Sequence, residues 1–473
     1  MASGMWCLDH HPISAERLGP SDHAVGKHRR TSRTLPVAFR VVAKAHFQAP
    51  RGTRDILPPD TDRWRALLAA FADLTNRSGY GQVVSPIFED IGVFKRIGEA
   101  TDVVTKEMFD FLDKGDPPQH LALRPELTAS ICRAYAEHRP TPPWKVWYEG
   151  PQFRYEKPQA GRYRQFSQVG IEVLGADDAA VDVEVIALAW RFYEALGMSA
   201  VRLLVNSLGD PTCRPDYLAA LGAYLEERSG ELSEQARTTL QQNPLRVLDS
   251  KRAEDQTVIA EAPLMVDFLT SDCADHFAAV IDGLDALGIP YELSPRLVRG
   301  LDYYTRTTFE FVSDALDSAQ NAVGGGGRYD GLVEDLGGPA TPGIGFALGV
   351  DRILLACDAE GVFAAPAPGV QVFVVDMTDG QQATLLCDEL RRAGLGADRG
   401  FGGRSLKAQM KVADRSRARV ALLVGEDELA DDAVTVRDLR GDGSQQRLPR
   451  AGLGSALTQL IQNLPPIATE TPS

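Results

Sequence analysis

The chain has 473 residues, of which 44% are hydrophobic and 24% are charged, and its formal net charge is -15. This length exceeds what one hydrophobic core usually serves, so we expect an ordinary globular protein of two or three domains. No apolar run approaches the roughly 20 residues that a membrane-spanning helix needs, which excludes an integral membrane protein. The acidic balance argues against indiscriminate nucleic-acid binding and limits any RNA contact to local basic clusters.

The six cysteines are scattered singly along the chain, without a C-x-x-C pair. They are Cys7, Cys132, Cys213, Cys273, Cys357 and Cys387. This spacing predicts neither a disulfide framework nor a zinc site, so no metal is expected from a side-chain motif. A protein of the reducing cytoplasm fits this cysteine usage best.

Residues 1–46 differ from the rest of the chain, because they are rich in Arg and Lys and have almost no acidic residue after Asp22. We expect a disordered extension or a wrongly assigned start, with translation beginning near Val41. A transit peptide is the alternative. The folded part is expected to begin after this segment, at about Arg51.

The first folded elements are a helix and a short strand. Asp60 or Thr61 can cap a helix that runs to about Asn76. A strand is expected at residues 83–87. Because proline cannot donate to a ladder, Pro86 places this strand at an edge, at a bulge or in an interface.

A strand that ends at Pro125 leads into a helix expected at residues 128–136. Glu126 and Thr128 lie in the turn between these two elements. They can point into a cleft, or they can simply cap the helix. The residues alone leave both interpretations open.

Residues 148–175 have the pattern of a long antiparallel hairpin around a polar loop at residues 157–161. The apolar face of its second strand consists of Val169, Ile171 and Val173. The other face carries Arg162, Arg164, Phe166, Gln168, Gly170 and Glu172. We interpret this face as a binding floor, and a solvated outer strand is the alternative. Glycine is unfavourable in mid-strand, so we hypothesise that a side chain at Gly170 would intrude on the pocket.

The stretch after the hairpin is mainly helical. A helix is expected at about 177–196 and a strand at 201–206. Helical periodicity then dominates residues 214–289, which we interpret as an insertion. Within it, residues 243–251 form a turn with a short amphipathic piece that carries no chemistry by itself.

Strand character returns at residues 297–311, which are dense in Thr, Tyr and Phe. The glycine run at residues 324–327 allows close approach of a ligand, or it forms a flexible turn. A strand at 343–350 feeds a helix at 351–355. Arg352 in the first turn of that helix opposes the helix dipole, so we expect it to meet an anion or an aromatic face.

Residues 366–369 are expected to form a linker, after which strand and helix alternate. Strands at 370–375 and 420–424 flank a helix at 382–392. This order predicts a separate small α/β domain with a parallel-type sheet. No G-x-G-x-x-G follows the first strand, so a dinucleotide site is disfavoured.

Arginines on three separate elements, Arg154, Arg299 and Arg352, are the strongest chemical signal. Guanidinium groups bind phosphate in a bidentate manner and stack on purines, so their convergence with Phe166 predicts a nucleoside triphosphate site. The sequence contains neither a P-loop nor a kinase signature. Phosphate is therefore expected to be held by side chains on an antiparallel sheet.

From about Arg51 to its C-terminus the chain resembles the histidyl-tRNA synthetases, which are class II aminoacyl-tRNA synthetases. Three segments resemble the class II motifs: residues 79–89, 148–175 and 343–355. Two further segments, residues 297–304 (LVRGLDYY) and 124–128 (RPELT), are similar to segments that characterise this family.

The resemblance implies a fold and a division of the chain. The catalytic domain, residues 47–365, would be α+β, with an antiparallel sheet flanked by helices and a helical insertion at about 214–289. Residues 366–473 would form a C-terminal α/β anticodon-binding domain, and residues 1–46 would lie outside the fold. The implied enzyme is a cytoplasmic homodimer that joins L-histidine to histidine tRNA, with ATP and Mg²⁺.

The resemblance also implies roles for individual residues. Catalytic roles fall to Arg154, Arg299 and Arg352. Histidine would contact Glu126, Thr128, Arg154, Gln168, Glu172, Arg299, Tyr303 and Tyr304. ATP would contact Arg154, Arg162, Phe166, Tyr329 and Arg352. The tRNA would contact Lys157, Gln159 and Arg162.

Some of these roles are specific. The adenine ring would lie between Phe166 and Arg352, and Arg299 would sit at the α-phosphate, where other class II enzymes place a metal. Glu172 and Tyr304 would bond the two imidazole nitrogens. Lys157 departs from the arginine of many relatives, so one phosphate contact of the tRNA would be monodentate.

Three other functions compete with this one. A regulatory subunit of ATP phosphoribosyltransferase binds histidine without charging tRNA, but such paralogues lack the C-terminal domain and lose catalytic positions. This chain keeps Arg154, Arg299, Arg352 and residues 370–464. A domain that senses uncharged tRNA would normally be fused to a kinase. A purely structural protein would leave many buried charges without a purpose.

Overall fold

The computed structural model describes residues 47–96, 106–317, 320–366 and 369–464. The extension expected at residues 1–46 lies outside these ranges, as do residues 367 and 368 of the expected linker. The described chain contains an eight-stranded, a five-stranded and a three-stranded sheet. None of the helices in the described ranges is long and apolar enough to cross a membrane.

The eight-stranded sheet carries the strands of the predicted hairpin. Its strands, in spatial order, are β1 (Gly81–Gln82), β5 (Trp144–Phe153), β6 (Gln165–Leu174), β11 (Gly343–Gly349), β10 (Ala322–Arg328), β9 (Thr305–Ser313), β7 (Val201–Ser207) and β8 (Glu292–Leu293). All neighbours pair antiparallel except the two edge pairs, β1 with β5 and β7 with β8. The expected antiparallel sheet and the expected hairpin of β5 and β6 are confirmed.

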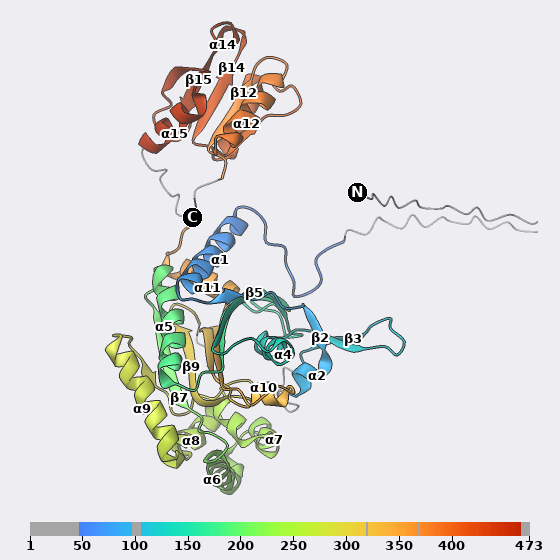
Figure 1. The fold of residues 1–473 in the computed structure, drawn as a ribbon, viewed down its shortest axis with the longest axis vertical. Coiled ribbons are helices and arrows are strands. Elements are labelled where there is room, and N and C mark those ends of the chain that lie inside the picture. Colours follow the sequence, from blue (N-terminus) through green and yellow to red (C-terminus); the bar gives the residue numbers. More distant parts are fainter. Residues whose placement is uncertain (1–46, 97–105, 318–319, 367–368, 465–473) are drawn as a thin grey trace, which may run out of the picture. The chain divides into compact units, whose positions relative to one another are not determined.

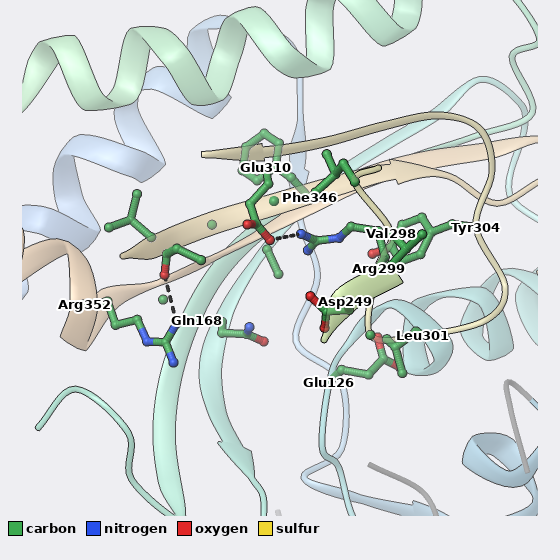
Figure 2. Close-up of a pocket in the computed structure, with 18 of the residues that line it drawn as sticks. Glu126, Gln168, Asp249, Val298, Arg299, Leu301, Tyr304, Glu310, Phe346 and Arg352 are labelled. Atoms are coloured by element: carbon green, nitrogen blue, oxygen red, sulfur yellow. Dashed lines mark hydrogen bonds and ion pairs between the residues drawn. The ribbon is translucent and has the colours of Figure 1, made fainter. Parts of the chain in front are cut away.

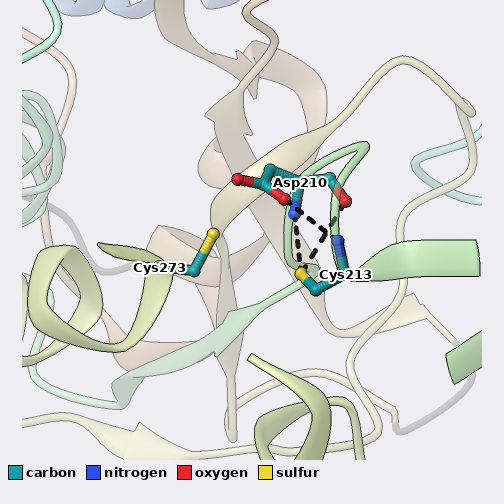
Figure 3. A group of neighbouring side chains, drawn as sticks. All are labelled: Asp210, Cys213 and Cys273. Atoms are coloured by element: carbon teal, nitrogen blue, oxygen red, sulfur yellow. Dashed lines mark hydrogen bonds between the residues drawn. The ribbon is translucent and has the colours of Figure 1, made fainter. Parts of the chain in front are cut away.

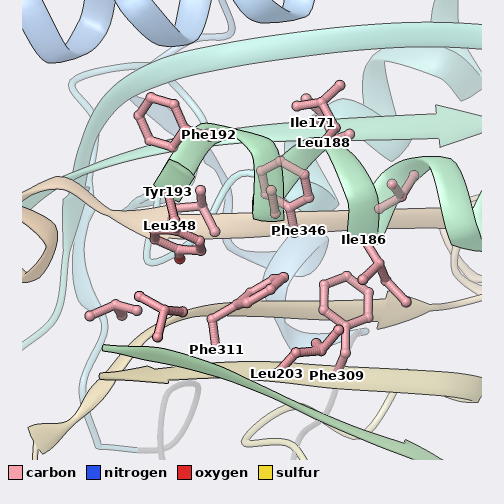
Figure 4. Close-up of a cluster of buried hydrophobic side chains, with 14 of the residues drawn as sticks. Ile171, Ile186, Leu188, Phe192, Tyr193, Leu203, Phe309, Phe311, Phe346 and Leu348 are labelled. Carbon is pink, nitrogen blue, oxygen red and sulfur yellow. The ribbon is translucent and has the colours of Figure 1, made fainter. Parts of the chain in front are cut away.

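One face of this sheet is covered by helices. The helices that contribute to the main core are α1 (Asp60–Arg77), α5 (Ala179–Ala195), α9 (Ser271–Ala286) and α11 (Val350–Glu360). Figure 4 shows Ile171 of β6, Phe309 of β9 and Phe346 of β11 in this cluster with Phe192 of α5. The alternation predicted for β6 is therefore correct, and its other residues are left for the opposite face of the sheet.

The start of α1 differs from the expectation. The helix begins at Asp60, but its N-cap is Pro59, and no side chain accepts a hydrogen bond there. Capping by Asp60 or Thr61 is therefore wrong. Asp60 and Asp62 lie in the first turn instead, where negative charge complements the helix dipole.

The strand expected at residues 83–87 is also wrong. The segment lies between two short strands, β1 and β2 (Phe88–Asp90). Strand β2 belongs to the three-stranded sheet, in which β4 (His120–Leu123) pairs with both β2 and β3 (Phe109–Leu112). The guanidinium of Arg124 donates to the carbonyl oxygens of Ser85 and Pro86, at 2.9 and 3.1 Å. These carbonyls are satisfied by a side chain, so the segment needs no ladder. Helices α2 (Ile91–Lys95) and α4 (Thr128–His138) adjoin this sheet.

Helices fill the insertion as the periodicity predicts. They are α6 (Arg214–Glu227), α7 (Glu234–Gln242), α8 (Ala253–Glu261) and α9, with 3-10 turns at Ser229–Glu231, Pro244–Asp249 and Met265–Phe268. The first three helices form a core of their own around Tyr217, Leu221 and Val258. Helix α9 lies beside α5 (Figure 1), so it joins this insertion to the large sheet.

Two expectations for residues 297–331 need correction. Strand β9 begins only at Thr305, and the preceding residues form a loop. The glycine run is no flexible turn, because it lies within β10 in the centre of the sheet. A Cβ atom on Gly325 would lie 2.6 Å from a guanidinium nitrogen of Arg299, and one on Gly327 would lie 2.9 Å from the ring of Tyr304. The glycines therefore make room for the loop that precedes β9. The short helix α10 (Leu332–Asp335) follows β10.

The C-terminal part has its own sheet and core. The strand order is β13 (Ala397–Arg399), β12 (Val372–Asp376), β14 (Val420–Val424), β15 (Ala433–Asp438) and β16 (Gln445–Pro449). Its helices are α12 (Gln381–Arg392), α13 (Leu406–Arg415), α14 (Glu426–Ala430) and α15 (Leu453–Asn463). The expected α/β domain is confirmed, but only β13, β12 and β14 are parallel. The antiparallel pairing of β15 and β16 corrects the expectation of a parallel-type sheet.

Candidate functional site

A cavity of about 550 Å³ lies against the face of the large sheet that the helical core leaves free. Strands β6, β9, β10 and β11, the start of α11 and the loop before β9 contribute to its wall. The predicted residues that line it are Glu126, Thr128, Arg154, Arg162, Phe166, Gln168, Arg299, Tyr303, Tyr304, Tyr329 and Arg352. Lys157, Gln159 and Glu172 are not on this wall. The residues from distant segments thus converge as the sequence predicted.

Two of the three arginines are held by backbone carbonyls. Arg154 donates through Nε to the oxygen of Pro125 at 2.9 Å, and its guanidinium carbon lies 5.3 Å from the ring centroid of Phe166. Arg352 donates through Nη1 to Ala322 at 2.9 Å and through Nε to Gly161 at 3.3 Å. Burial lowers the pKa of both, and for Arg352 the neighbouring positive charges of Arg162 and Arg154 lower it further. Such crowded cations favour an anionic ligand.

Arg299 is held by a carboxylate that the sequence reasoning missed. Its Nη1 lies 2.6 Å from Oε2 of Glu310, and Figure 2 shows the two side chains pointing toward each other. Burial lowers the pKa of Arg299, but the neighbouring Glu310, Tyr304 and Tyr303 together outweigh burial and raise it. The strand alternation offered a signal for Glu310, because Phe309 and Phe311 on either side of it are buried in the core.

The turn before α4 answers the question left open for Glu126. Its carboxylate accepts from the backbone amides of Thr128 and Ala129, at 2.8 and 2.9 Å, so it caps the helix. The same side chain lines the cavity. Both interpretations therefore hold at once, and burial raises the pKa of this carboxyl.

Glu172 lies one layer behind the cavity wall and is 0% exposed. Its carboxylate accepts from the hydroxyl groups of Thr128 at 2.7 Å, Tyr148 at 3.2 Å and Tyr329 at a short distance. Burial raises its pKa to about 8. Tyr329 also lies against Tyr303, with 5.8 Å between ring centroids. Tyr329 also lines the cavity, and the contact with ATP that the resemblance implies for it stays a prediction.

An acceptor on the wall has no partner among the described residues. This atom is Oε1 of Gln168, which is buried. In the loop before β9, the rings of Tyr303 and Tyr304 lie 4.6 Å apart. Unpaired buried acceptors are rare in native proteins, so Gln168 is suited to accept from a ligand.

Gly170 makes room for a neighbouring side chain and not directly for a ligand. A Cβ atom there would collide with the phenol of Tyr148 and the carbonyl oxygen of Phe346. Gly170 itself is absent from the cavity wall. The hypothesis of direct intrusion is therefore replaced by an indirect one, in which Gly170 allows Tyr148 to reach Glu172.

For the histidine- and ATP-dependent activity that the family resemblance implies, we expect Gly170→Val to raise the KM for histidine roughly tenfold or more and to leave the KM for ATP nearly unchanged, because it displaces a donor to Glu172. Steady-state exchange kinetics measure both constants. Tyr148→Phe is the matched comparison, since it removes the same hydroxyl without adding volume. Equal changes in the two KM values would contradict this role of Gly170.

The loop between β5 and β6 holds the three residues predicted to meet tRNA. Lys157 and Gln159 are exposed, and the backbone groups of Gln159 and Arg162 bond each other at 2.9 and 3.1 Å. Arg162 is half-buried, forms an ion pair with Glu156 and reaches the cavity. The loop therefore extends from the solvent to the cavity.

The insertion contributes wall residues that the sequence analysis did not assign. Leu248, Asp249 and Lys251 all line the cavity, and the carboxylate of Asp249 lies 3.2 Å from the ammonium of Lys251. They belong to the segment at 243–251, which was expected to carry no chemistry. Its amphipathic pattern gives no signal for this contact, because the contact depends on tertiary packing.

Two family models match the chain. The one described as histidyl-tRNA synthetase matches residues 52–353. The one described as anticodon binding domain matches residues 370–460. The first of these matches covers more than half of the chain.

Relatives are similar over most of the chain. A histidine–tRNA ligase of Rhodococcus erythropolis is 48% identical over 423 residues, which are 88% of this chain and 99% of the relative. A histidine–tRNA ligase of Streptomyces coelicolor is 50% identical over 400 residues, which are 83% of this chain and 93% of the relative.

Solved structures agree with these relatives. The crystal structure of apo histidyl-tRNA synthetase from S. aureus has a TM-score of 0.74 at 37% identity and covers 87% of this chain and 99% of that one. An ATP phosphoribosyltransferase regulatory subunit/histidyl-tRNA synthetase from Bacillus halodurans has a TM-score of 0.57 at 21% identity and covers 78% of this chain and 97% of that one. The second likeness shows the fold alone.

Proposed function

The chain belongs to the histidyl-tRNA synthetase family, and from this premise we propose that it charges histidine tRNA in two steps. Histidine and ATP first give histidyl-adenylate and pyrophosphate, and histidine then passes to the 3′ end of the tRNA. The observation that carries this proposal is the convergence of Arg154, Arg299 and Arg352 on one cavity that is also lined by polar residues for an amino acid. Residues 47–365 would hold this site and residues 366–473 the anticodon-binding domain.

ATP would lie at the side of the cavity formed by Arg154, Arg162, Phe166 and Arg352. The crowding of the three arginines, which lowers the pKa of Arg352, supports an anionic ligand there. Phe166 offers a flat apolar surface for one face of the adenine ring, and the guanidinium of Arg352 can stack on the other face of the adenine. Mg²⁺ would enter with the β and γ phosphates as part of the nucleotide substrate.

Histidine would lie at the other side, near Glu126 and Tyr304. The buried carboxylate of Glu126, Oγ1 of Thr128 and the unpaired Oε1 of Gln168 suit an α-ammonium group, which is a donor only. Glu172, Tyr303 and Tyr304 would bind the imidazole ring. The carboxyl of Glu172 accepts from the hydroxyls of Thr128 and Tyr329 and so fixes their positions. A pocket with such fixed polar groups rejects amino acids that leave them unpaired.

Arg299 would stabilise the transition state of the first step. The histidine carboxylate attacks the α-phosphorus, a P–O bond forms, and the bond to pyrophosphate breaks as charge builds on the α-phosphate oxygens. A guanidinium that is already desolvated and fixed by Glu310 can meet that charge without reorganisation. The neighbouring glycines of β10 allow Arg299 to lie close to the sheet.

The tRNA would meet the hairpin loop and the C-terminal domain. Lys157 and Gln159 are exposed, and Arg162 joins them to the cavity. In the C-terminal domain, the ring of Phe401 is 64% exposed and lies 4.8 Å from the guanidinium carbon of Arg399. An exposed aromatic ring beside cations is typical of surfaces on which unpaired bases stack.

A charging assay tests the second step. The family resemblance implies that Gln159 and Arg162 meet an additional guanosine at the 5′ end of histidine tRNA. Purified protein is therefore given ATP, histidine and histidine tRNA transcripts that either carry or lack this guanosine. We expect faster charging of the transcript that carries it, and we expect replacement of Gln159 or Arg162 to reduce that preference. Formation of the adenylate without any charging would contradict the proposed transfer step.

The five described cysteines are all free, which supports activity in a reducing cytoplasm.

We also propose that the protein is a homodimer, and an exposed apolar patch supports this. Val84, Phe88 and Phe111 are 86, 51 and 42% exposed, and the rings of the last two lie 6.4 Å apart. Ile87 and Leu112, which adjoin Phe88 and Phe111 in the chain, are also exposed. A group of exposed apolar side chains marks an interaction site, and Pro86 among them cannot donate to an added ladder.

We expect Val84→Asp to shift the protein from dimer to monomer in sedimentation velocity, because it places a charge in a desolvated interface. Exchange activity should fall with the loss of the dimer. Leu429→Asp is the control, since Leu429 is an exposed leucine outside the patch. A wild-type protein that sediments as a monomer at all concentrations would contradict the proposed dimer.

A further inference from the structure

The structure brings together two cysteines that lie far apart in the sequence. Cys213 precedes α6, and Cys273 lies in the first turn of α9. Figure 3 shows both with Asp210, and their two sulfur atoms and a carboxylate oxygen all lie within 4.8 Å of one another. We propose that these three side chains bind a soft divalent metal ion of the zinc class.

The donor set decides the class of metal. Two thiolates and one carboxylate are ligands that zinc accepts in tetrahedral sites, with the fourth position open to water. Calcium and magnesium prefer oxygen ligands alone, so a site with two sulfur atoms disfavours them. The sequence gives no sign of this site, because the cysteines occur one at a time and the ligands come from two separate segments.

The ligands are held inside the core of the insertion. Cys213 and Cys273 are 4% and 1% exposed, and both belong to the cluster that includes Met265. The loop that carries Asp210 turns at Gly209, where φ is +61° and an added Cβ would lie 2.6 Å from the sulfur of Cys213. The backbone of this loop therefore approaches the sulfur closely, and the site is formed before any ligand binds.

The three proposed ligands differ in how readily they lose a proton to bind a metal. Burial raises the pKa of the Asp210 carboxyl, but bonds from the Cys273 thiol and from two backbone amides outweigh burial and keep that pKa below its usual range. The amide of Asp210 donates to the sulfur of Cys213 at 3.3 Å. Burial raises the pKa of Cys273 to about 11. Binding would replace both thiol protons by the metal (2 RSH + Zn²⁺ gives Zn(SR)₂ + 2 H⁺).

Such a metal would fasten the first helix of the insertion to the last. Helix α9 packs against α5 under the large sheet, and the insertion also supplies Asp249 to the cavity wall. The metal would therefore stiffen one wall of the site from outside it. The alternative is that both thiols pack as small apolar groups while Asp210 stabilises the turn before α6 without a metal.

Titration of the full chain with Co²⁺ tests the site. We expect the metal-free protein to bind one Co²⁺ with a thiolate-to-cobalt charge-transfer band, and we expect Zn²⁺ to remove that band and raise the melting temperature. Cys213→Ala and Cys273→Ala should abolish the band. Cys387→Ala should keep it, because Cys387 is an equally buried cysteine of the C-terminal domain.

Asp210→Asn is a second test, for the case that the cysteine variants fail to fold. It keeps both thiols and an oxygen that can accept from the amides of the α6 turn. We expect it to melt like the wild type without metal and to bind Zn²⁺ about tenfold or more weakly. Absence of the charge-transfer band in the wild type, or equal bands in the wild type and Cys213→Ala, would overturn the proposal.

Discussion

Arg299→His lowers histidine-dependent ATP–pyrophosphate exchange by about 100- to 1000-fold and leaves the fold intact. This is the expected result, because Arg299 is the cation that we place at the α-phosphate, and loss of one fixed charge donor of this kind has effects of that size. The imidazole cannot span the space between Glu310 and the cavity as the guanidinium does. The KM for histidine and that for ATP should change far less than kcat.

The control for this variant is Arg202→His. Arg202 also pairs with carboxylates, Asp314 at 2.9 Å and Glu292 at 2.7 Å, but it does not line the cavity. The Arg202→His variant should retain exchange activity. The melting temperature of Arg299→His, measured by circular dichroism, should remain close to that of the wild type because Glu310 is partly exposed and can hydrate. Near-normal exchange by Arg299→His would show that its assigned role is wrong.

Glu172→Gln raises the KM for histidine by roughly 10- to 100-fold and leaves the KM for ATP nearly unchanged. The two oxygens of the Glu172 carboxyl accept from the hydroxyls of Thr128, Tyr148 and Tyr329, whereas an amide keeps one acceptor oxygen and replaces the other by an NH₂ group that only donates. At least one hydroxyl must therefore turn away, and a buried polar group is left unpaired. Glu89→Gln is the control, since Glu89 is a buried carboxylate paired with Arg133 outside the cavity.

The same variant has a signature in the pH dependence of stability. Burial raises the pKa of Glu172 from 4.5 to about 8, so the folded state holds a proton that the unfolded state releases above about pH 4.5. The contribution to stability is complete below pH 4.5 and is lost as the pH rises toward 8. Between pH 5 and 9 the melting temperature of the wild type should fall more than that of Glu172→Gln. Parallel curves for the two proteins would count against this burial effect.

The main hairpin could be predicted because its signals are local. The alternation of Val169, Ile171 and Val173 is a period of two over a long stretch, and the loop between the strands is marked by Pro158 and Gly161. The same local logic failed at residues 297–304. Their tyrosines favour a strand, but the backbone there leaves the sheet so that Arg299 and Tyr304 can line the cavity.

The remaining errors concern contacts between distant segments. Gly325 and Gly327 of β10 leave room for Arg299 and Tyr304, and Gly170 leaves room for Tyr148 on the neighbouring strand. Glu310, Asp249 and the pair of Cys213 and Cys273 became candidates only when the fold placed them. Periodicity identifies the face on which a residue lies, but it does not identify the partner that it meets.

Histidine-dependent exchange of pyrophosphate into ATP tests whether the protein forms histidyl-adenylate. The purified full chain is incubated with ATP, Mg²⁺ and labelled pyrophosphate, with or without L-histidine. We expect label in ATP only when histidine is present, and little label with other amino acids. A protein that binds histidine in the same cavity without any exchange would refute adenylate formation and would favour a histidine-binding regulatory paralogue.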